Sequence, residues 1–207
     1  IARIRANMAA AAREAGRDPK EILLVGASKM NDAAACREAV AAGIDALGEN
    51  RVQEMVQKLE QHAYDGAPLH FIGHLQRNKV KQVVGHVALI QSVGSLELLD
   101  EIEKVAAARG LVQDILLEVN IGREAAKSGF APEKVLPAAE ASLERTHVRV
   151  RGLMTIPPAD AQRDANFRYF QEVQALYVDM NQKLFHNELE YLSMGMSGDY
   201  EDAIRAG

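Results

Sequence analysis

Lys29 is the residue whose position most directly suggests covalent chemistry. It follows the apolar run 22–27 and Ser28, so the sequence predicts a lysine just beyond the end of a buried strand. An ammonium group at that depth is expected to be partly desolvated, and desolvation favours the neutral amine that attacks an aldehyde. The alternative is an ordinary lysine on a solvated loop, and position alone leaves that alternative open.

The segment 194–199 has the composition of an anion-binding loop. Two glycines and Ser197 stand between a predicted strand and a helix that begins near Tyr200. Backbone N–H groups in such a loop suit a phosphate, and the hydroxyl of Ser197 adds a donor. In the alternative interpretation Ser197 or Asp199 only caps the helix, while Gly195 and Gly198 serve the turn.

Two further patterns predict no site. Residues 122–129 (GREAAKSG) resemble a nucleotide P-loop, but the pattern requires a glycine directly before the Lys-Ser pair, and Ala126 stands there. His70 and His74 would lie about 13 Å apart on a strand, which is too far to share a metal ion. We therefore expect neither nucleotide hydrolysis nor a metal site.

The composition narrows the choice of partners. The chain has 207 residues, and its 24 basic and 29 acidic side chains give a formal net charge of −5, which offers no general attraction to nucleic acid or to an anionic membrane. The basic cluster of Arg77, Lys79 and Lys81 is expected to be a solvated helix face. Cys36 is the only cysteine, so an intramolecular disulfide is excluded, and a reducing cytoplasm fits.

The two ends of the chain and its apolar stretches predict no membrane segment. No stretch reaches the roughly 20 apolar residues of a membrane helix, and no apolar signal core follows the first residues. Because the chain opens with Ile1 and not with methionine, we expect it to be part of a longer protein.

Short apolar runs alternate with longer segments of helical period along the whole chain. Strict alternation of this kind favours a parallel sheet covered by helices, either an open sheet or a closed barrel. Seven units without a linker favour one TIM-type (β/α) barrel domain over 1–207, with an extra helix before the first strand that ends near Gly16. A barrel needs an eighth strand, and we find none after the seventh run. The seven runs are 22–27, 44–47, 69–72, 87–93, 115–119, 148–154 and 189–194.

Three apolar stripes are predicted to be the core faces of helices. They comprise Val52, Met55, Val56 and Leu59; Leu98, Leu99, Ile102, Val105 and Ala106; and Phe167, Phe170, Val173, Tyr177, Met180 and Leu184.

Polar residues at the carboxyl ends of the strands are expected to form a rim around one mouth of the barrel, where ligands bind in this architecture. Such a rim shows where a site would lie and little about its reaction. The rim residues are Ser28, Lys29, Glu49, Asn50, His74, Ser92, Asn120, Thr155, Ser197 and Gly198.

Taken together, these segments resemble the pyridoxal 5′-phosphate (PLP) homeostasis family, also called YggS or PROSC proteins. The motifs run in one order along nearly the whole chain, which makes them far more specific than any one alone. They are LVGASK (24–29), LGEN (47–50), HFIGHLQRNK (70–79), VNI (119–121), KSG (127–129), RGLMTIP (151–157) and LSMGMSGD (192–199).

The resemblance implies a single barrel similar to the N-terminal domain of alanine racemases, with PLP held as a Schiff base on Lys29. It also implies that Asn50 lies near the cofactor and that Ser197 and Gly198 contribute to the phosphate cradle. Family members continue to a last strand of the form Thr-x-Val-Arg-Ile-Gly, which supplies a further phosphate contact and an arginine facing the pyridine nitrogen. This sequence lacks that C-terminal segment, and we expect the segment to be disordered or omitted and not missing from the molecule, because an open barrel would expose a strand edge and an unfilled core.

The resemblance further implies a non-catalytic carrier that exchanges PLP with PLP-dependent apoenzymes, without catalytic residues of its own. We expect a cytoplasmic monomer. One alternative is an amino-acid racemase with Lys29 as one base, but none of the five tyrosines is clearly placed to act as the second, and no separate β-domain is seen. Another alternative is a scaffold that binds partners through the helix bearing Arg77 and Lys79, without a cofactor.

Overall fold

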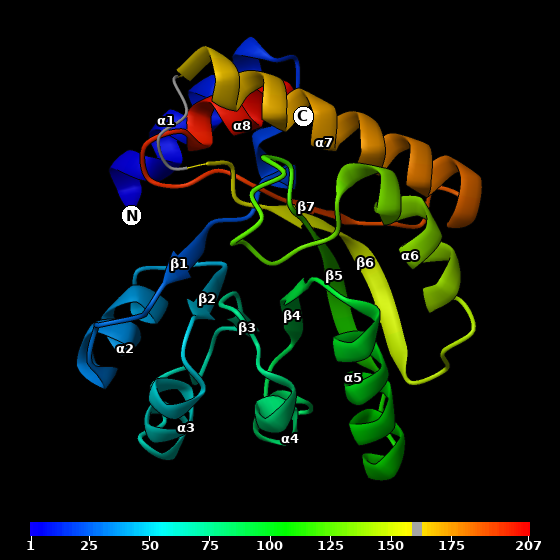
Figure 1. Ribbon diagram of the computed structural model, residues 1–207. Coiled ribbons are helices and arrows are strands. Elements are labelled where there is room, and N and C mark those ends of the chain that lie inside the picture. Colours follow the sequence, from blue (N-terminus) through cyan, green and yellow to red (C-terminus); the bar gives the residue numbers. More distant parts are fainter. Residues whose placement is uncertain (159–162) are drawn as a thin grey trace.

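The protein is built on one curled parallel sheet. The computed structural model describes residues 1–158 and 163–207. Each strand pairs in parallel with the next one along the chain, so the spatial order of the strands is their sequence order. Figure 1 shows the sheet curling into part of a barrel with β1 and β7 as its edges. The strands are β1 (Val25–Ala27), β2 (Ala46–Glu49), β3 (Leu69–Phe71), β4 (Leu89–Val93), β5 (Gln113–Val119), β6 (Val148–Thr155) and β7 (Tyr191–Ser193).

Helices cover the outside of this sheet (Figure 1). One helix follows each strand, and α1 precedes the first strand and packs against α8, so the first and last helices lie side by side. Three short 3-10 turns complete the connections, at Pro19–Glu21, Arg77–Lys79 and Pro132–Lys134. The helices are α1 (Ala2–Glu14), α2 (Ala33–Ala41), α3 (Val52–Glu60), α4 (Val80–Val83), α5 (Leu96–Arg109), α6 (Val135–Ser142), α7 (Arg163–Leu184) and α8 (Tyr200–Ala206).

The sheet is apolar on both faces, as parallel sheets require. The larger core lies between the sheet and the helices, where Ile90 and Leu117 from strands pack in one cluster with Met55 and Leu99 from helices. A smaller cluster of Leu89, Leu116 and Met154 comes from the alternate strand positions, which face the inside of the curl. An inner face packed by side chains of the strands themselves, with the helices on the outer face, is typical of a barrel-type sheet.

The sequence predicted this architecture correctly. All seven predicted strands and the N-terminal helix are confirmed, and so is the α/β class with parallel strands of barrel type. The three apolar stripes do face the core, as the complete burial of Met55, Ile102 and Val173 illustrates. Among residues 1–158 and 163–207 no strand follows β7, and β1 and β7 are not paired.

Two strand ends were predicted too early, since β2 includes Glu49 and β6 includes Thr155, both of which were expected just after strands. Ser92 was expected at the rim although the predicted run 87–93 contained it, and it lies within β4. All three residues are buried. Each side chain is satisfied locally: Ser92 Oγ donates to the carbonyl of Gly73 at 2.5 Å, and Thr155 Oγ1 donates to that of Val119 at 2.8 Å. A buried polar residue can extend a strand when a partner lies within reach.

A hydrogen-bonded network of three polar side chains crosses the inner face of the curled sheet. Nε2 of Gln91 donates to Nδ1 of His70 at 2.9 Å, and Oε1 of Gln91 accepts from the hydroxyl of Ser193 at 2.7 Å. Gln91 belongs to β4, His70 to β3 and Ser193 to β7, so the network joins β7 to two strands that are distant from it in the sheet. Burial lowers the pKa of His70 to about 4, which keeps the imidazole neutral and able to accept this bond.

Candidate functional site

The turn after β1 presents Lys29 to solvent. Ser28 continues the pairing of β1, since its N–H donates to the carbonyl of Gly48 at 2.8 Å, and the chain then turns so that the N–H of Asn31 donates to the carbonyl of Ser28 at 3.1 Å. Lys29 is exposed, and its side chain makes no hydrogen bond or ion pair with any residue that the structure describes. The expected partial desolvation of Lys29 was therefore wrong: the strand ends at Ala27, and the lysine projects from a turn beyond it.

Asn50 lies beside this turn. The register of β1 with β2 pairs Ala27 with Gly48, so Lys29 and Asn50 each stand two residues beyond this pair, at the same end of the two strands. The Oδ1 atom of Asn50 is buried, and no described residue gives it a hydrogen bond. A buried amide oxygen without a donor is rare in folded proteins and marks a place where a further polar group would be stabilising.

The predicted anion loop follows β7 as a tight turn. Gly195 has φ +88°, and a Cβ there would stand 2.8 Å from Cα of Tyr200, so this position requires glycine. Asp199 is the residue that closes the turn, because its carboxylate accepts from the N–H of Met196 at 2.5 Å and from Nδ2 of Asn166 at 3.1 Å. Asp199, and not Ser197, occupies the N-cap position of α8, but its side chain makes no capping hydrogen bond to that helix.

Ser197 and Gly198 are left exposed by this arrangement. Neither the hydroxyl of Ser197 nor the N–H groups of the two residues bond to any part of the chain that the structure describes. A Cβ placed on Gly198 would meet nothing within 4 Å, so the glycine is not required by packing. These donors face open space at the same end of the sheet as Lys29.

The predicted rim thus divides into free and engaged groups. Lys29, His74 and Ser197 are exposed, whereas Ser92 and Thr155 bind backbone carbonyls. Asn120 is engaged as well: its side chain exchanges hydrogen bonds with the backbone of Glu124 at 2.9 and 3.1 Å, which closes the loop after β5. The structure brings Lys29 and Asn50 together, while Ser197 and Gly198 lie on the loop at the other edge of the sheet.

Sequence reasoning missed a buried polar cluster directly behind Lys29. Glu49 is completely buried, and its Oε1 atom accepts from Ser28 Oγ at 2.7 Å, from Tyr64 OH at 3.1 Å and from the ammonium group of Lys58. The signal was available, because Lys58 lies three residues after Met55 and so on the core side of its helix. A lysine in an apolar stripe indicates a buried partner.

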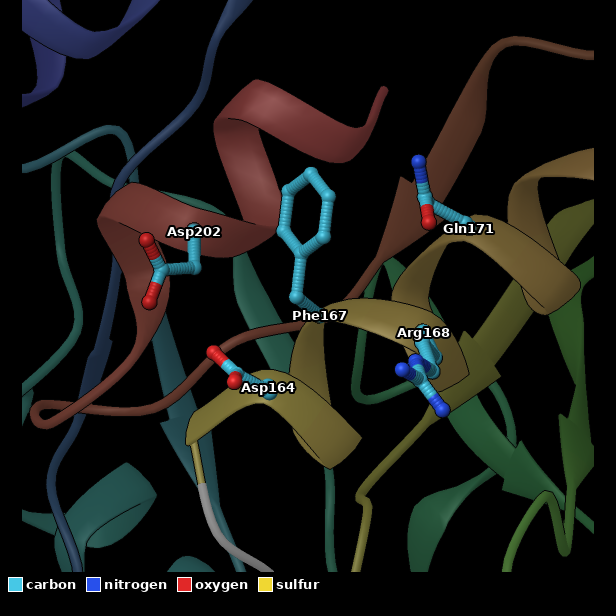
Figure 2. A pocket seen from close by; sticks show the side chains of 5 residues that line it. All are labelled: Asp164, Phe167, Arg168, Gln171 and Asp202. Carbon is cyan, nitrogen blue, oxygen red and sulfur yellow. The ribbon is translucent and has the colours of Figure 1, made fainter.

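Two features at other places add nothing to this site. A shallow pocket of about 290 Å³ lies between α7 and α8, and Figure 2 shows the five side chains that line it. None of the four predicted site residues is among them. In the described part of the chain, no group of three or more His, Cys, Asp or Glu side chains is placed to hold a metal ion, and none of the helices described has the length and apolarity needed to cross a bilayer.

Known proteins resemble this chain over nearly its whole length. Residues 1–206 match the family model of the alanine racemase N-terminal domain. A pyridoxal phosphate homeostasis protein of Aquifex aeolicus is 41% identical over 207 residues, which is all of this chain and 90% of the relative. The structure of PipY from Synechococcus elongatus with PLP bound is 30% identical, with a TM-score of 0.82 over 97% of this chain and 94% of that one.

An alanine racemase of Clostridium difficile shares the fold alone, with a TM-score of 0.67 at 17% identity over 93% of this chain and 48% of the racemase. The full-length relative at 41% identity decides between the families that share this fold. The chain belongs to the pyridoxal phosphate homeostasis protein family, which is built on the barrel of the alanine racemase N-terminal domain.

Proposed function

We propose that this chain is a non-catalytic carrier of PLP, which it holds as a Schiff base on Lys29. The observation that carries the proposal is an exposed, unpaired lysine amine beside the unpartnered amide oxygen of Asn50, at the ligand-binding end of a barrel-type sheet. The relatives named as PLP homeostasis proteins support the choice of ligand. We also propose that residues 1–207 act as one domain, because a single family model spans almost all of them.

The available groups suit the chemistry of this ligand. PLP brings an aldehyde that reacts with amines, a ring with a hydroxyl group, and a phosphate. The amine of Lys29 is free to react with the aldehyde carbon, with loss of water, and the buried oxygen of Asn50 can accept a bond from a polar hydrogen close by. The hydroxyl of Ser197 and the N–H groups of Ser197 and Gly198 are donors of the kind that phosphate oxygens accept.

Replacing Ser197 with alanine is expected to weaken PLP binding and to leave pyridoxal binding almost unchanged, because the hydroxyl donates to the phosphate only. A hydrogen bond to a charged group contributes about 1.5–3 kcal/mol, so the dissociation constant for PLP should rise roughly ten-fold to a hundred-fold. Absorption titrations of both ligands measure the effect.

The matched control for this titration is Ser128→Ala. Ser128 is also exposed near the carboxyl end of the sheet, but its hydroxyl is bound to the carboxylate of Glu118 at 3.0 and 3.1 Å, so both ligands should bind that variant normally. Equal losses of PLP and pyridoxal affinity in Ser197→Ala would assign Ser197 to the turn and not to the phosphate.

The racemase alternative gains no support from the tyrosines. A second base would need a free phenol at the mouth, but Tyr64 donates to Glu49, and Tyr177 donates to the carbonyl of Leu189 at 2.8 Å. Tyr200 accepts from Asn7 at 3.2 Å. Tyr169 packs against the main core and Tyr191 against the inner one.

Exposed apolar side chains around the mouth support exchange with partner proteins. Met30, Ile156 and Met196 follow β1, β6 and β7, and all three are exposed, Met30 to 86%. Exposed apolar groups that gather at one place often mark a protein contact. We propose that PLP-dependent apoenzymes dock here on a cytoplasmic carrier that is otherwise a monomer; the single buried thiol of Cys36 is consistent with a reducing compartment.

Direct transfer predicts that a PLP-dependent apoenzyme is activated by the loaded carrier faster than PLP dissociates into solution. The variant Met30→Gln, Met196→Gln should slow this activation, because it removes apolar contact area while leaving the PLP-binding side chains in place. Stopped-flow measurement of both rates is the test. Activation no faster than dissociation would show release into solution instead, and sedimentation of the carrier alone checks the monomer.

A further inference from the structure

The backbone on both sides of Lys29 is tied to charged side chains, of which Lys58 is buried and Glu54 is partly exposed. Nζ of Lys58 donates to the carbonyl of Ser28 at 2.7 Å and also contacts the carboxylate of Glu49. On the other side of Lys29, the N–H of Met30 donates to the carboxylate of Glu54 at 3.1 Å, and this carboxylate lies 3.7 Å from the same ammonium group of Lys58. One ammonium group thus links the two flanks of the turn.

The carboxylate of Glu49 also reaches the backbone of Asn50. While Oε1 of Glu49 collects three donors, its Oε2 accepts from the N–H of Asn50 at 3.3 Å. The cluster therefore touches the backbone at or next to both residues that we assign to the cofactor. Glu49 is completely buried and Lys58 is 7% exposed, so solvent does not weaken their interaction as it would at the surface.

The turn needs such support, because it is strained. Met30 has φ +63°, a left-handed conformation that residues with a Cβ rarely adopt, and its side chain is almost fully exposed, so side-chain packing does not hold it. The hydrogen bond from the N–H of Met30 also holds the pKa of Glu54 below its usual range, which shows that this carboxylate is stabilised in its charged form.

We propose that Glu49 and Lys58 are positioning residues that hold the Lys29 turn and Asn50 in the geometry that binds PLP. The inference rests on the proposed function and extends it to two residues that do not touch the ligand. This one buried pair fixes the direction in which the Lys29 side chain projects from the turn. It also fixes the distance between Lys29 and the side-chain amide of Asn50. Groups that orient ligand-binding side chains typically change affinity about 10-fold to 100-fold when they are removed from metal sites, and we expect a similar range here.

The decisive variant is the double substitution Glu49→Gln, Lys58→Met. Removing one partner alone would leave an unpaired buried charge, which is strongly destabilising, whereas replacing both with neutral groups of similar volume is often tolerated. We expect the double variant to remain folded, to bind PLP at least about ten-fold more weakly, and to give less pyridoxyl adduct on Lys29 after borohydride reduction. In the ligand-free protein, the amide hydrogens of residues 28–31 should exchange faster than in the wild type.

The matched control is Asp45→Asn. Asp45 also ties down β1 through a carboxylate, since it accepts from the N–H of Leu24 at 2.7 Å and from Arg5 at 3.0 Å, but it does so at the end of the strand opposite Lys29. This variant should lose stability without losing PLP affinity. If the double variant does not fold, Tyr64→Phe decides, because it removes one neutral donor to Glu49 and should still weaken PLP binding measurably.

The outcomes separate the two proposals. A wild-type protein that forms no pyridoxyl adduct on Lys29 would overturn the proposed function and this inference with it. A wild-type adduct that persists at unchanged affinity in the folded double variant, or in Tyr64→Phe when the double variant is unfolded, would overturn the positioning role alone. A loss of affinity matched by the same loss in Asp45→Asn would also overturn it, because general destabilisation would then explain both.

Discussion

Replacing Lys29 with alanine is expected to abolish the covalent pyridoxyl adduct that borohydride reduction traps on the wild-type protein. Only the deprotonated amine of a lysine placed beside the bound aldehyde forms this bond. The neighbouring Lys58 is buried, and its ammonium group is bound to Glu49 and to the carbonyl of Ser28, so Lys29 is the available amine at this turn. Because Lys29 is exposed and has no partner within the chain described, its removal should change the stability to unfolding by less than about 0.5 kcal/mol.

Mass spectrometry of peptides after reduction is the measurement, with Lys79→Ala and Lys127→Ala as controls. Neither control residue lies on the Lys29 turn, so each of those variants should give the full wild-type adduct. An undiminished adduct on another lysine in Lys29→Ala would show that the reactive amine has been assigned to the wrong residue. Phosphate contacts would still allow weak non-covalent binding, which a titration without borohydride would detect.

Acidification is expected to destabilise the protein through His70. Burial lowers the pKa of His70 from 6.5 to about 4, so between these values the unfolded chain binds a proton that the folded protein does not. Stability from this residue is therefore fully present above about pH 6.5 and is lost as the pH falls toward 4, by about 3 kcal/mol. A proton on Nδ1 of His70 would face the amide N–H of Gln91 and disrupt the hydrogen-bonded network that continues to Ser193.

Urea unfolding of the wild type and of His70→Asn across this pH range tests the assignment. The variant should be less stable at neutral pH but should lose less stability on acidification, because asparagine does not titrate. The comparison is needed because burial raises the pKa of Glu118, and a carboxyl with a raised pKa has the opposite dependence, gaining stability as the pH falls. Parallel pH profiles for the two proteins would remove His70 from the explanation.

The fold was predictable because it depends on repeating patterns. Apolar runs and helical stripes recur along the chain, and complete burial of Ile90 and Met55 follows from those patterns alone. Strand ends were less predictable, because they depend on partners distant in sequence. Glu49 can lie buried within β2 because Tyr64 and Lys58 donate to its carboxylate, and both are distant from the strand in sequence.

The residues of the candidate site stay predictions from the sequence, whereas their surroundings could be predicted from it only in part. Lys29, Asn50, Ser197 and Gly198 were assigned through several motifs at matching spacing, and their roles stay predictions. Position along the strand suggested a desolvated lysine, but β1 ends at Ala27 and Lys29 lies exposed on the turn that follows. For the supporting cluster, the place of Lys58 on the core side of α3 indicated a buried partner, but the identity of that partner, Glu49 on β2, depends on a contact between elements that no local pattern specifies.

The most direct test of the carrier assignment is an absorption titration of the purified wild-type protein with PLP. We predict a visible band that saturates at one PLP per chain, is lost on borohydride reduction, and leaves a pyridoxyl group on the peptide that contains Lys29. Absence of a saturable band, or saturation without a pyridoxyl group on that peptide, would contradict the assignment of Lys29 as the residue that holds the cofactor.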